Sequence, residues 1–227
     1  MNAAVRISVI VPVLNEAQLI AAALSGLQSL RARGHEIVVV DGGSTDGTFA
    51  LSQSRADRVI SAPRGRAIQM NAGAREATGE VLLFLHADTR LPQAADELVV
   101  DALARHEWGR FDVTIDSAHP LLAVVAFMMN LRSRITGIAT GDQAMFVTRA
   151  AFEKAGGFPA IGLMEDVALS SALKRRGDPA CLKAKAIASG RRWEQRGVIT
   201  TIVLMWRLRL LYFLGTDPAR LAQIYAR

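Results

Sequence analysis

The sequence predicts an α/β fold, a single domain in which a mostly parallel sheet is flanked by helices. The chain has 227 residues, 51% of them hydrophobic, which is enough for one packed core and too apolar for a disordered chain. In its first half, short β-branched apolar runs alternate with segments of helical periodicity. The connections between these segments are short, as is typical of parallel strands joined by helices.

The elements of the first half follow from this alternation. Residues 7–14 (ISVIVPVL) are nearly all apolar and mostly β-branched, which predicts a strand buried on both faces. One helix is expected from residue 17 to 30, ended by Gly34. Further strands are expected at 37–40, 58–60 and 81–85, with helices at 48–55 and 66–78.

The second half carries weaker signals. Residues 111–115 alternate like a half-exposed strand. Other strands are expected at 144–147 and 181–187, and helices at 93–105, 121–134, 165–176, 198–214 and 219–225. Because no shift in composition marks a boundary, we expect one domain.

The charge balance favours an anionic partner. Lys and Arg number 27 against 21 Asp and Glu, a net charge of +6. Nucleic acid, phosphorylated metabolites and an acidic membrane face are the candidates. Aromatic residues are only 6%, and no basic stripe with interleaved aromatics is present, so we expect no nucleic acid partner. The single cysteine, Cys181, excludes an intrachain disulfide and fits a reducing compartment.

Neither of the two most apolar segments predicts a transmembrane helix. Residues 121–129 are too few to span a bilayer, and 198–214 contains Arg207 and Arg209, about 200° apart on a helix. No signal peptide is recognised. We therefore expect a cytoplasmic protein. The 198–214 segment leaves two interpretations open, packing on the core or a partner and peripheral binding to the inner face of the cell membrane.

Polar residues follow three of the expected strands, where parallel sheets bind their ligands. These are Asn15-Glu16, Asp41-Gly42-Gly43-Ser44 and His86-Ala87-Asp88. Asp41 either forms a turn or accepts hydrogen bonds from a nucleotide. Asp88 either caps the next helix or holds a divalent cation that bridges two phosphates.

Two further groups carry alternatives. The Glu165-Asp166 pair either complements the dipole of the helix that starts there or supplies a general base. The basic clusters at 64–66 with Arg75, and at 191–192 with Arg196, are either solvated faces or a grip on a diphosphate.

The order of the sequence motifs along the chain resembles that of family-two inverting glycosyltransferases with the GT-A fold. The resemblance lies in residues 9–16 (VIVPVLNE), 40–48 (VDGGSTDGT), 71–74 (NAGA), 84–89 (FLHADT) and 165–166 (ED). The chain is most similar to the branch called rSAM/selenodomain-associated transferase 2, through residues 65–67, 69–73, 84–88, 141–143 and 191–194. Members of that branch are sometimes named glucosyltransferases of carotenoid acids, which implies a lipid-like or carotenoid-acid acceptor.

The resemblance also implies roles for individual positions and regions. Asp166 is the implied general base, and Asp88 the implied ligand of Mn²⁺ or Mg²⁺. The implied donor-binding residues are Pro12, Asn15, Glu16, Asp41, Arg66, Asn71, His86, Ala87, Asp88, Arg192 and Trp193. The implied acceptor-side residues are Gly141, Asp142, Gln143 and Glu165. The single domain over 1–227 then divides into a nucleotide-binding half (1–90), an acceptor and catalytic half (91–195) and C-terminal helices (196–227).

Two positions depart from the family pattern. The usual DDGS reads Asp41-Gly42-Gly43-Ser44, and the first carboxylate of the DxD motif is His86. Loss of a negative charge at residue 86 is expected to weaken cation affinity, leaving Asp88 and the phosphate oxygens to hold the metal.

The implied reaction is a single displacement. A hydroxyl or carboxylate acceptor attacks the sugar of a nucleotide diphosphate donor and inverts its anomeric centre. A nucleotidyltransferase is a weaker alternative because residues 14–17 (LNEA) are not a glycine- and lysine-rich loop. A non-catalytic nucleotide-sugar binding protein is the other alternative, but it assigns no function to Asp166. The identity of the acceptor and the oligomeric state are left open.

Overall fold

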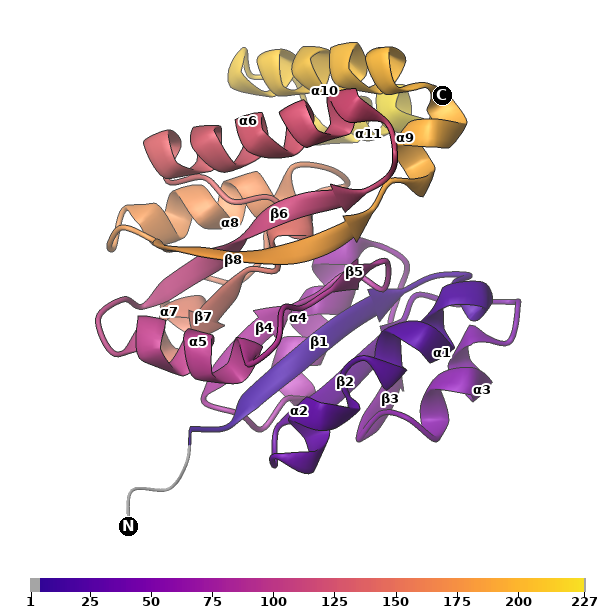
Figure 1. Cartoon of the computed structure of the whole chain (residues 1–227), viewed down its shortest axis with the longest axis vertical. Coiled ribbons are helices and arrows are strands. Elements are labelled where there is room, and N and C mark those ends of the chain that lie inside the picture. Colours follow the sequence, from indigo (N-terminus) through magenta and orange to yellow (C-terminus); the bar gives the residue numbers. More distant parts are fainter. Residues whose placement is uncertain (1–4, 227) are drawn as a thin grey trace.

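The computed structural model describes residues 5–226, and an eight-stranded sheet with helices on both faces forms its framework (Figure 1). The strands are β1 (Ile7–Val13), β2 (Glu36–Asp41), β3 (Arg58–Ser61), β4 (Val81–Phe84), β5 (Thr89–Arg90), β6 (Trp108–Asp116), β7 (Phe146–Thr148) and β8 (Ala180–Ser189). The helices are α1 (Ala17–Ser25), α2 (Gln28–Ala32), α3 (Thr48–Gln53), α4 (Arg66–Glu76), α5 (Ala95–Leu103), α6 (Pro120–Thr136), α7 (Arg149–Lys154), α8 (Glu165–Lys174), α9 (Arg191–Arg196), α10 (Val198–Phe213) and α11 (Pro218–Ala226), with a 3-10 turn η1 at Gly141–Gln143.

The strand order is β3-β2-β1-β4-β7-β6-β8-β5. The first four of these strands are parallel, β7 runs antiparallel to both β4 and β6, and β8 is parallel to β6. β1 lies between β2 and β4, so the chain leaves β1 toward one side of the sheet and later returns on the other. In such sheets the crevice at this switch point, beyond the carboxyl ends of the strands, is the usual ligand site.

The core explains why nearly every residue of the first strand is apolar. Val9, Val11 and Val13 of β1 belong to a buried cluster that includes side chains of α1, α2 and α5. Ile10, which points to the other face, packs in a second cluster with α4, α7 and α8. Because both faces are covered, apolar side chains are needed at nearly every position, and the prediction of a doubly buried strand is confirmed.

Two predicted elements were wrong in detail. The single helix expected over 17–30 is two helices, because the Gln28 side chain donates from Nε2 to the carbonyls of Leu24 (2.8 Å) and Arg55 (2.9 Å) and so replaces a helical hydrogen bond. The expected half-exposed strand is almost entirely buried in β6. Its polar Asp112 is buried as well, because it pairs with Arg110 and Arg134.

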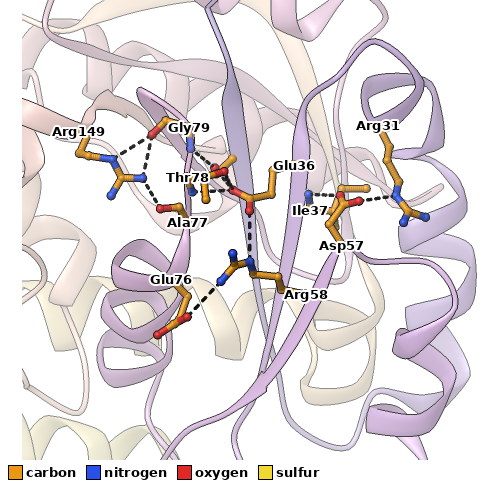
Figure 2. Close-up of polar contacts among 11 residues, drawn as sticks. Arg31, Glu36, Ile37, Asp57, Arg58, Glu76, Ala77, Thr78, Gly79 and Arg149 are labelled. Atoms are coloured by element: carbon orange, nitrogen blue, oxygen red, sulfur yellow. Dashed lines mark hydrogen bonds and ion pairs between the residues drawn. The ribbon is translucent and has the colours of Figure 1, made fainter.

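A polar network joins the amino ends of the strands, at the opposite edge from the switch point (Figure 2). The buried Glu36 carboxylate accepts hydrogen bonds from Ser8 Oγ (2.5 Å) and from the amide of Thr78 (2.7 Å). Arg149 donates to the carbonyls of Ala74, Ala77 and Gly79, which satisfies the carboxyl end of α4. These bonds fix the end of α4 whose other end contributes to the site.

Helices α6 and α10 lie side by side at one end of the molecule, at the top of Figure 1, and pack together through Leu122, Ala126, Val198 and Ile202. Their outer sides carry large apolar side chains exposed to solvent. We call this the apolar face; it comprises Leu121, Val124, Phe127, Met128, Leu131, Ile135, Ile199, Val203, Trp206, Leu210, Phe213 and Leu214. Within residues 5–226, no helix is both long enough and apolar enough to cross a bilayer.

Candidate active site

A pocket of about 450 Å³ opens between the switch-point edge of the sheet, the start of α8 and the pair α6 and α10. Its polar lining consists of Arg66, His86, Arg132, Thr140, Asp142, Asp166, Arg192, Arg209 and Tyr225. Its apolar lining comes from α6, α10 and the start of α8, with Trp193 of α9. The pocket therefore joins residues predicted for the donor side to an apolar passage that the sequence did not predict.

Asp166 is held rigidly in the wall of this pocket. It is the second residue of α8, and its carboxylate accepts hydrogen bonds from the amides of Gly141 (Oδ2, 2.8 Å) and Val167 (Oδ1, 2.7 Å). The residue just before α8, Met164, has a left-handed backbone (φ 68°), a strained conformation for a side chain of this size. Such strain is characteristic of residues that aim a functional group, and here it sets the entry into the helix that carries Asp166.

Glu165 forms an ion pair with an arginine of the pocket. It is 3% exposed, and its Oε1 pairs with Nε of Arg66 at 2.9 Å, while Oε2 has no hydrogen-bond partner in the part of the chain described. Burial, together with the neighbouring Asp166, raises the pKa of Glu165 above its ordinary value, although Arg66 opposes the shift. Glu165 thus anchors Arg66, which itself lines the pocket.

His86 and Asp142 form a second polar pair in the pocket. His86 Nδ1 lies 3.5 Å from Asp142 Oδ1, and the imidazole packs against Gly141. A Cβ added at Gly141 would lie 2.4 Å from Cε1 of His86, so a larger residue there would force the imidazole or the turn to shift. Burial would raise the pKa of Asp142, but His86, Arg66 and Arg192 outweigh it and lower that pKa.

The first two strand ends are tied to one another. Asn15, in a left-handed conformation (φ 54°), donates its amide to Ser44 Oγ (2.8 Å) and accepts the amide of Thr45 at Oδ1 (2.9 Å). Asp41 is 3% exposed and accepts the amide (3.0 Å) and hydroxyl (2.5 Å) of Ser44. The Asp41 carboxylate therefore shapes this loop, which is the turn-forming alternative that the sequence raised.

The missing second acidic residue of the DDGS pattern has a physical reason. Gln69 of α4 donates from Nε2 to the carbonyls of Val13 and Val40, both at 2.8 Å, and clamps the ends of β1 and β2 together. A Cβ at Gly42 would lie 3.0 Å from Cδ and Oε1 of this amide, closer than ordinary contacts. The clamp and a side chain at residue 42 compete for the same space.

Asp88 lies near the carboxylate of Glu16, which pairs with Arg191 of α9. Glu16 Oε2 is 3.6 Å from Nη2 of Arg191, and burial together with Asp88 raises the pKa of Glu16 against the opposing effect of Arg191. Among residues 5–226, no group of three or more His, Cys, Asp or Glu side chains could hold a metal ion. One carboxylate with a neighbouring imidazole fits a cation whose other ligands are substrate phosphates, the usual mode for Mg²⁺.

The segment after β8 closes the pocket from the carboxyl-terminal side. Arg192 Nη1 donates to the hydroxyl of Tyr225 (2.8 Å), and the Arg196 guanidinium stacks 5.1 Å above the Tyr225 ring. Arg192, Trp193 and Tyr225 all line the pocket. The sequence predicted Arg192 and Trp193 here but not Tyr225, which comes from the last helix.

Nine predicted site residues do not line this pocket, namely Pro12, Asn15, Glu16, Asp41, Asn71, Ala87, Asp88, Gln143 and Glu165. Asn71 exchanges two hydrogen bonds with the backbone of Phe158 (2.7 and 2.9 Å), which ties α4 to the loop before α8. Gln143 is fully buried and completes a capping box with Thr140. Pro12 lies within β1, and Ala87 lies in the loop after β4. Asn71 and Gln143 thus stabilise loops beside the pocket from outside it.

The sequence missed Arg132 and Arg209, which enter the pocket from α6 and α10. The available signal was weak, because an arginine within an apolar helical run is also typical of a surface position. Only the packing of α6 against α10 shows that both arginines point inward.

Comparison with known proteins finds a family match in the amino-terminal half of the chain. Residues 8–119 match the family model described as Glycosyl transferase family 2. A PGL/p-HBAD biosynthesis glycosyltransferase of Mycobacterium tuberculosis (strain H37Rv) is 38% identical over 110 residues, which cover 45% of this chain and 41% of the relative. The matched part thus spans about two-fifths of that protein's length.

Solved structures extend the likeness along the chain. A mannosyltransferase from Pyrobaculum calidifontis, in complex with GDP-Man and Mn²⁺, aligns with a TM-score of 0.67 at 24% identity, covering 99% of this chain and 70% of the other. S. aureus TarS (residues 1–349) with UDP-GlcNAc aligns at 0.67 and 21% identity, covering 81% and 58%. These likenesses confirm the predicted fold, a single GT-A domain with a mostly parallel central sheet between helices.

Proposed function

We propose that this chain, which carries a family 2 glycosyl transferase domain over residues 8–119, transfers a sugar with inversion from a nucleoside diphosphate to an acceptor bound in the pocket. The observation that carries the proposal is Asp166. Its carboxylate is oriented by two backbone amides in the wall of the pocket, next to the strand ends where GT-A sheets bind their donors. An oriented carboxylate beside the reacting carbon is what a general base requires.

The donor would lie over the strand ends of the first ninety residues, the proposed nucleotide-binding half. The loops at Asn15-Glu16 and Asp41 would contact the nucleotide, and Arg66 with Arg192 would face the diphosphate. Two similar structures hold GDP-Man and UDP-GlcNAc, which supports a nucleotide sugar as donor. Guanidinium groups bind phosphate oxygens in a forked geometry and stabilise the charge that develops on the leaving diphosphate.

In the proposed reaction an acceptor oxygen attacks the anomeric carbon from the side of Asp166. As that bond forms, the bond from the anomeric carbon to the diphosphate oxygen breaks, and the acceptor proton moves to the Asp166 carboxylate. A carboxylate acceptor is already ionised near neutral pH and needs no base. The role of Asp166 is therefore largest for a hydroxyl acceptor, of which water is the simplest case.

Hydrolysis of the donor tests this role, because water is then the acceptor. UDP-glucose and GDP-mannose serve as probes. We expect Asp166→Asn to lower the hydrolysis rate about 10²–10⁴-fold while nucleoside diphosphate affinity stays within about threefold. Asp101→Asn, at an exposed carboxylate of α5, is the matched control and should leave the rate unchanged. A near-normal rate for Asp166→Asn removes Asp166 from the role of base.

We also propose a divalent cation, Mn²⁺ or Mg²⁺, with Asp88 as its protein ligand. Bound there, the cation would neutralise charge on the departing diphosphate. Similar structures hold Mn²⁺, or Mg²⁺ with UDP, which supports the proposal. Mn²⁺ should tighten UDP or GDP binding by wild type and have little effect on Asp88→Ala. An equal response of the two proteins excludes Asp88 as the ligand, and the absence of any response in wild type excludes the cation.

We further propose that the apolar face binds the inner surface of the cell membrane from the cytoplasm. Twelve of the fourteen large apolar side chains that are exposed in the described chain lie on α6, on α10 or just after it. Phe127→Glu combined with Phe213→Glu should abolish flotation with anionic phosphatidylglycerol vesicles. Leu51→Glu, at an exposed apolar residue of α3, is the matched control and should float like wild type. Flotation of the double variant would refute membrane binding through this face.

The acceptor proposed for this site is lipid-like, as in the rSAM/selenodomain-associated transferase 2 branch that the sequence resembles. The apolar lining of the pocket supports an acceptor with an apolar body. Val125, Met128, Ile202 and Met205 form part of that lining.

A further inference from the structure

Arg132 of α6 and Arg209 of α10 face the pocket from its two apolar helices. Nε and Nη2 of Arg132 and Nε of Arg209 are buried and make no hydrogen bond to any residue in the described range. Among residues 5–226, neither guanidinium has a carboxylate oxygen within 4.0 Å. The carboxylate of Asp166 is nevertheless close enough to attract both charges electrostatically. Asp166 itself is held by backbone amides instead.

This arrangement is unfavourable as it stands. A buried donor without a partner costs about 1–3 kcal/mol, and more if it is charged. Burial, reinforced by the neighbouring Arg209, lowers the pKa of Arg132 to about 10, so Arg132 still carries its proton at neutral pH. Two like charges are thus kept together in a largely apolar pocket, and an anion placed between them would relieve both the desolvation and the repulsion.

The surroundings of the two arginines restrict what kind of anion fits. The pocket walls beside them are apolar side chains of α6 and α10, namely Leu121, Val124, Val125, Met128, Ile202 and Trp206. Leu121, Val124, Met128 and Trp206 also belong to the exposed apolar face, so the passage runs from that face to the arginines. A small hydrophilic anion gains nothing from such walls, whereas an apolar chain attached to the anion would bury its surface against them.

We propose that Arg132 and Arg209 bind the anionic group, a carboxylate or a phosphate, of an acceptor whose long apolar chain occupies the passage between α6 and α10. The proposal rests on the transferase function only in calling this ligand the acceptor. It names the substrate class of the pocket, an anionic amphiphile, and gives the two arginines their task.

The simpler reading is that the arginines only balance the charge of Asp166 and Asp142. That reading predicts no preference for an anionic ligand over a neutral one of the same chain length. It also predicts that removal of either arginine leaves ligand affinity unchanged. The two readings differ in measurable binding, without any sugar donor.

The experiment measures binding of four probes to the full chain by tryptophan fluorescence, because Trp193 and Trp206 line the pocket while Trp108 is fully buried elsewhere. The probes, each below its micelle concentration, are dodecyl phosphate, dodecanoate, dodecanol and inorganic phosphate. We expect at least one of the two anionic amphiphiles to bind ten or more times as tightly as dodecanol and as inorganic phosphate. The tighter of the two identifies the anion as a phosphate or a carboxylate.

Variants then assign the preference to the arginines. Arg132→Met and Arg209→Met should each weaken binding of that anionic amphiphile about 10–100-fold, the loss of a charge-assisted hydrogen bond, and leave dodecanol within about threefold. Arg207→Met, on the exposed side of the same helix, is the matched control and should bind like wild type.

Equal affinity of wild type for dodecanol and both anionic amphiphiles overturns the proposal, and this comparison requires no variant to fold. Unchanged affinity of a folded Arg132→Met or Arg209→Met protein overturns it as well. If inorganic phosphate binds as tightly as dodecyl phosphate, the apolar passage plays no part and the proposed substrate class is wrong. Since no nucleotide sugar is present, these outcomes do not depend on whether transfer occurs.

Discussion

Substitution of Gly141 by alanine perturbs the site at its most tightly packed point. The new Cβ would lie 2.4 Å from Cε1 and 2.6 Å from Nε2 of His86, where ordinary contacts are 3.4–4 Å. Either His86 leaves Asp142 or the η1 turn moves, and the same turn supplies the amide that orients Asp166. Overpacking of this kind costs about 1–3 kcal/mol, so we expect the free energy of unfolding to fall by that amount and donor hydrolysis to slow at least tenfold.

Urea denaturation and UDP-glucose hydrolysis measure the two effects. Gly177→Ala is the matched control, because a Cβ there meets nothing within 4 Å and the backbone is not left-handed. In a His86→Ala background the space is already open, so Gly141→Ala should cost little, and the double-mutant cycle should give a coupling of about 1–3 kcal/mol. A clash with the imidazole is refuted as the cause if Gly141→Ala costs the same with and without His86, or if it behaves like Gly177→Ala.

Two further predictions concern stability away from the pocket. Burial raises the pKa of Asp96, but hydrogen bonds from Arg33 and His35 outweigh it and lower that pKa to about 2. The ionised Asp96 therefore stabilises the folded protein above the ordinary pKa of 3.8, and this contribution to the free energy of unfolding is lost as the pH falls toward 2. Because solvent screens the half-exposed Arg33, we expect Asp96→Asn to lower the free energy of unfolding by only about 1–2 kcal/mol at pH 6 and to have almost no effect at pH 2. A difference between the two proteins that stays constant across that pH range contradicts the ion pair. Arg149→Met should lower the free energy of unfolding by about 2–3 kcal/mol in thermal or urea denaturation, because two carbonyls at the end of α4 and that of Gly79 lose their donor. The exposed Arg175→Met should cost under about 0.5 kcal/mol, and equal effects would show that the network in Figure 2 adds nothing.

The sheet was largely predictable because its strands are buried on both faces and local composition alone marks them. Residues 7–14 are nearly all apolar because β1 lies in the middle of the sheet, where Val9 and Ile10 pack on opposite faces. The helix break at Gln28 and the burial of Asp112 were not predictable, because each depends on a partner distant in sequence, Arg55 in one case and Arg134 in the other.

Some residues of the site could likewise be predicted from the sequence, and others could not. His86 and Asp166 could be identified because short motifs hold them at a strand end and at a helix start, and the structure brings both to one pocket. Arg132 and Arg209 could not be identified, since their approach depends on how two apolar helices pack, and neither helix carries a local motif. The contacts of Asn71 could not be identified either, because its side chain ties α4 to the distant loop before α8 through the backbone of Phe158.

The most direct test of the proposed activity is the configuration of the sugar that the protein releases. Wild-type protein is incubated with an α-linked donor such as UDP-glucose, and proton NMR follows the free sugar before its anomers equilibrate. A single displacement on water predicts that the β-anomer appears first, at a rate that Asp166→Asn lowers about 10²–10⁴-fold. Initial release of the α-anomer, or an Asp166→Asn rate equal to that of wild type, would contradict inverting transfer with Asp166 as the base.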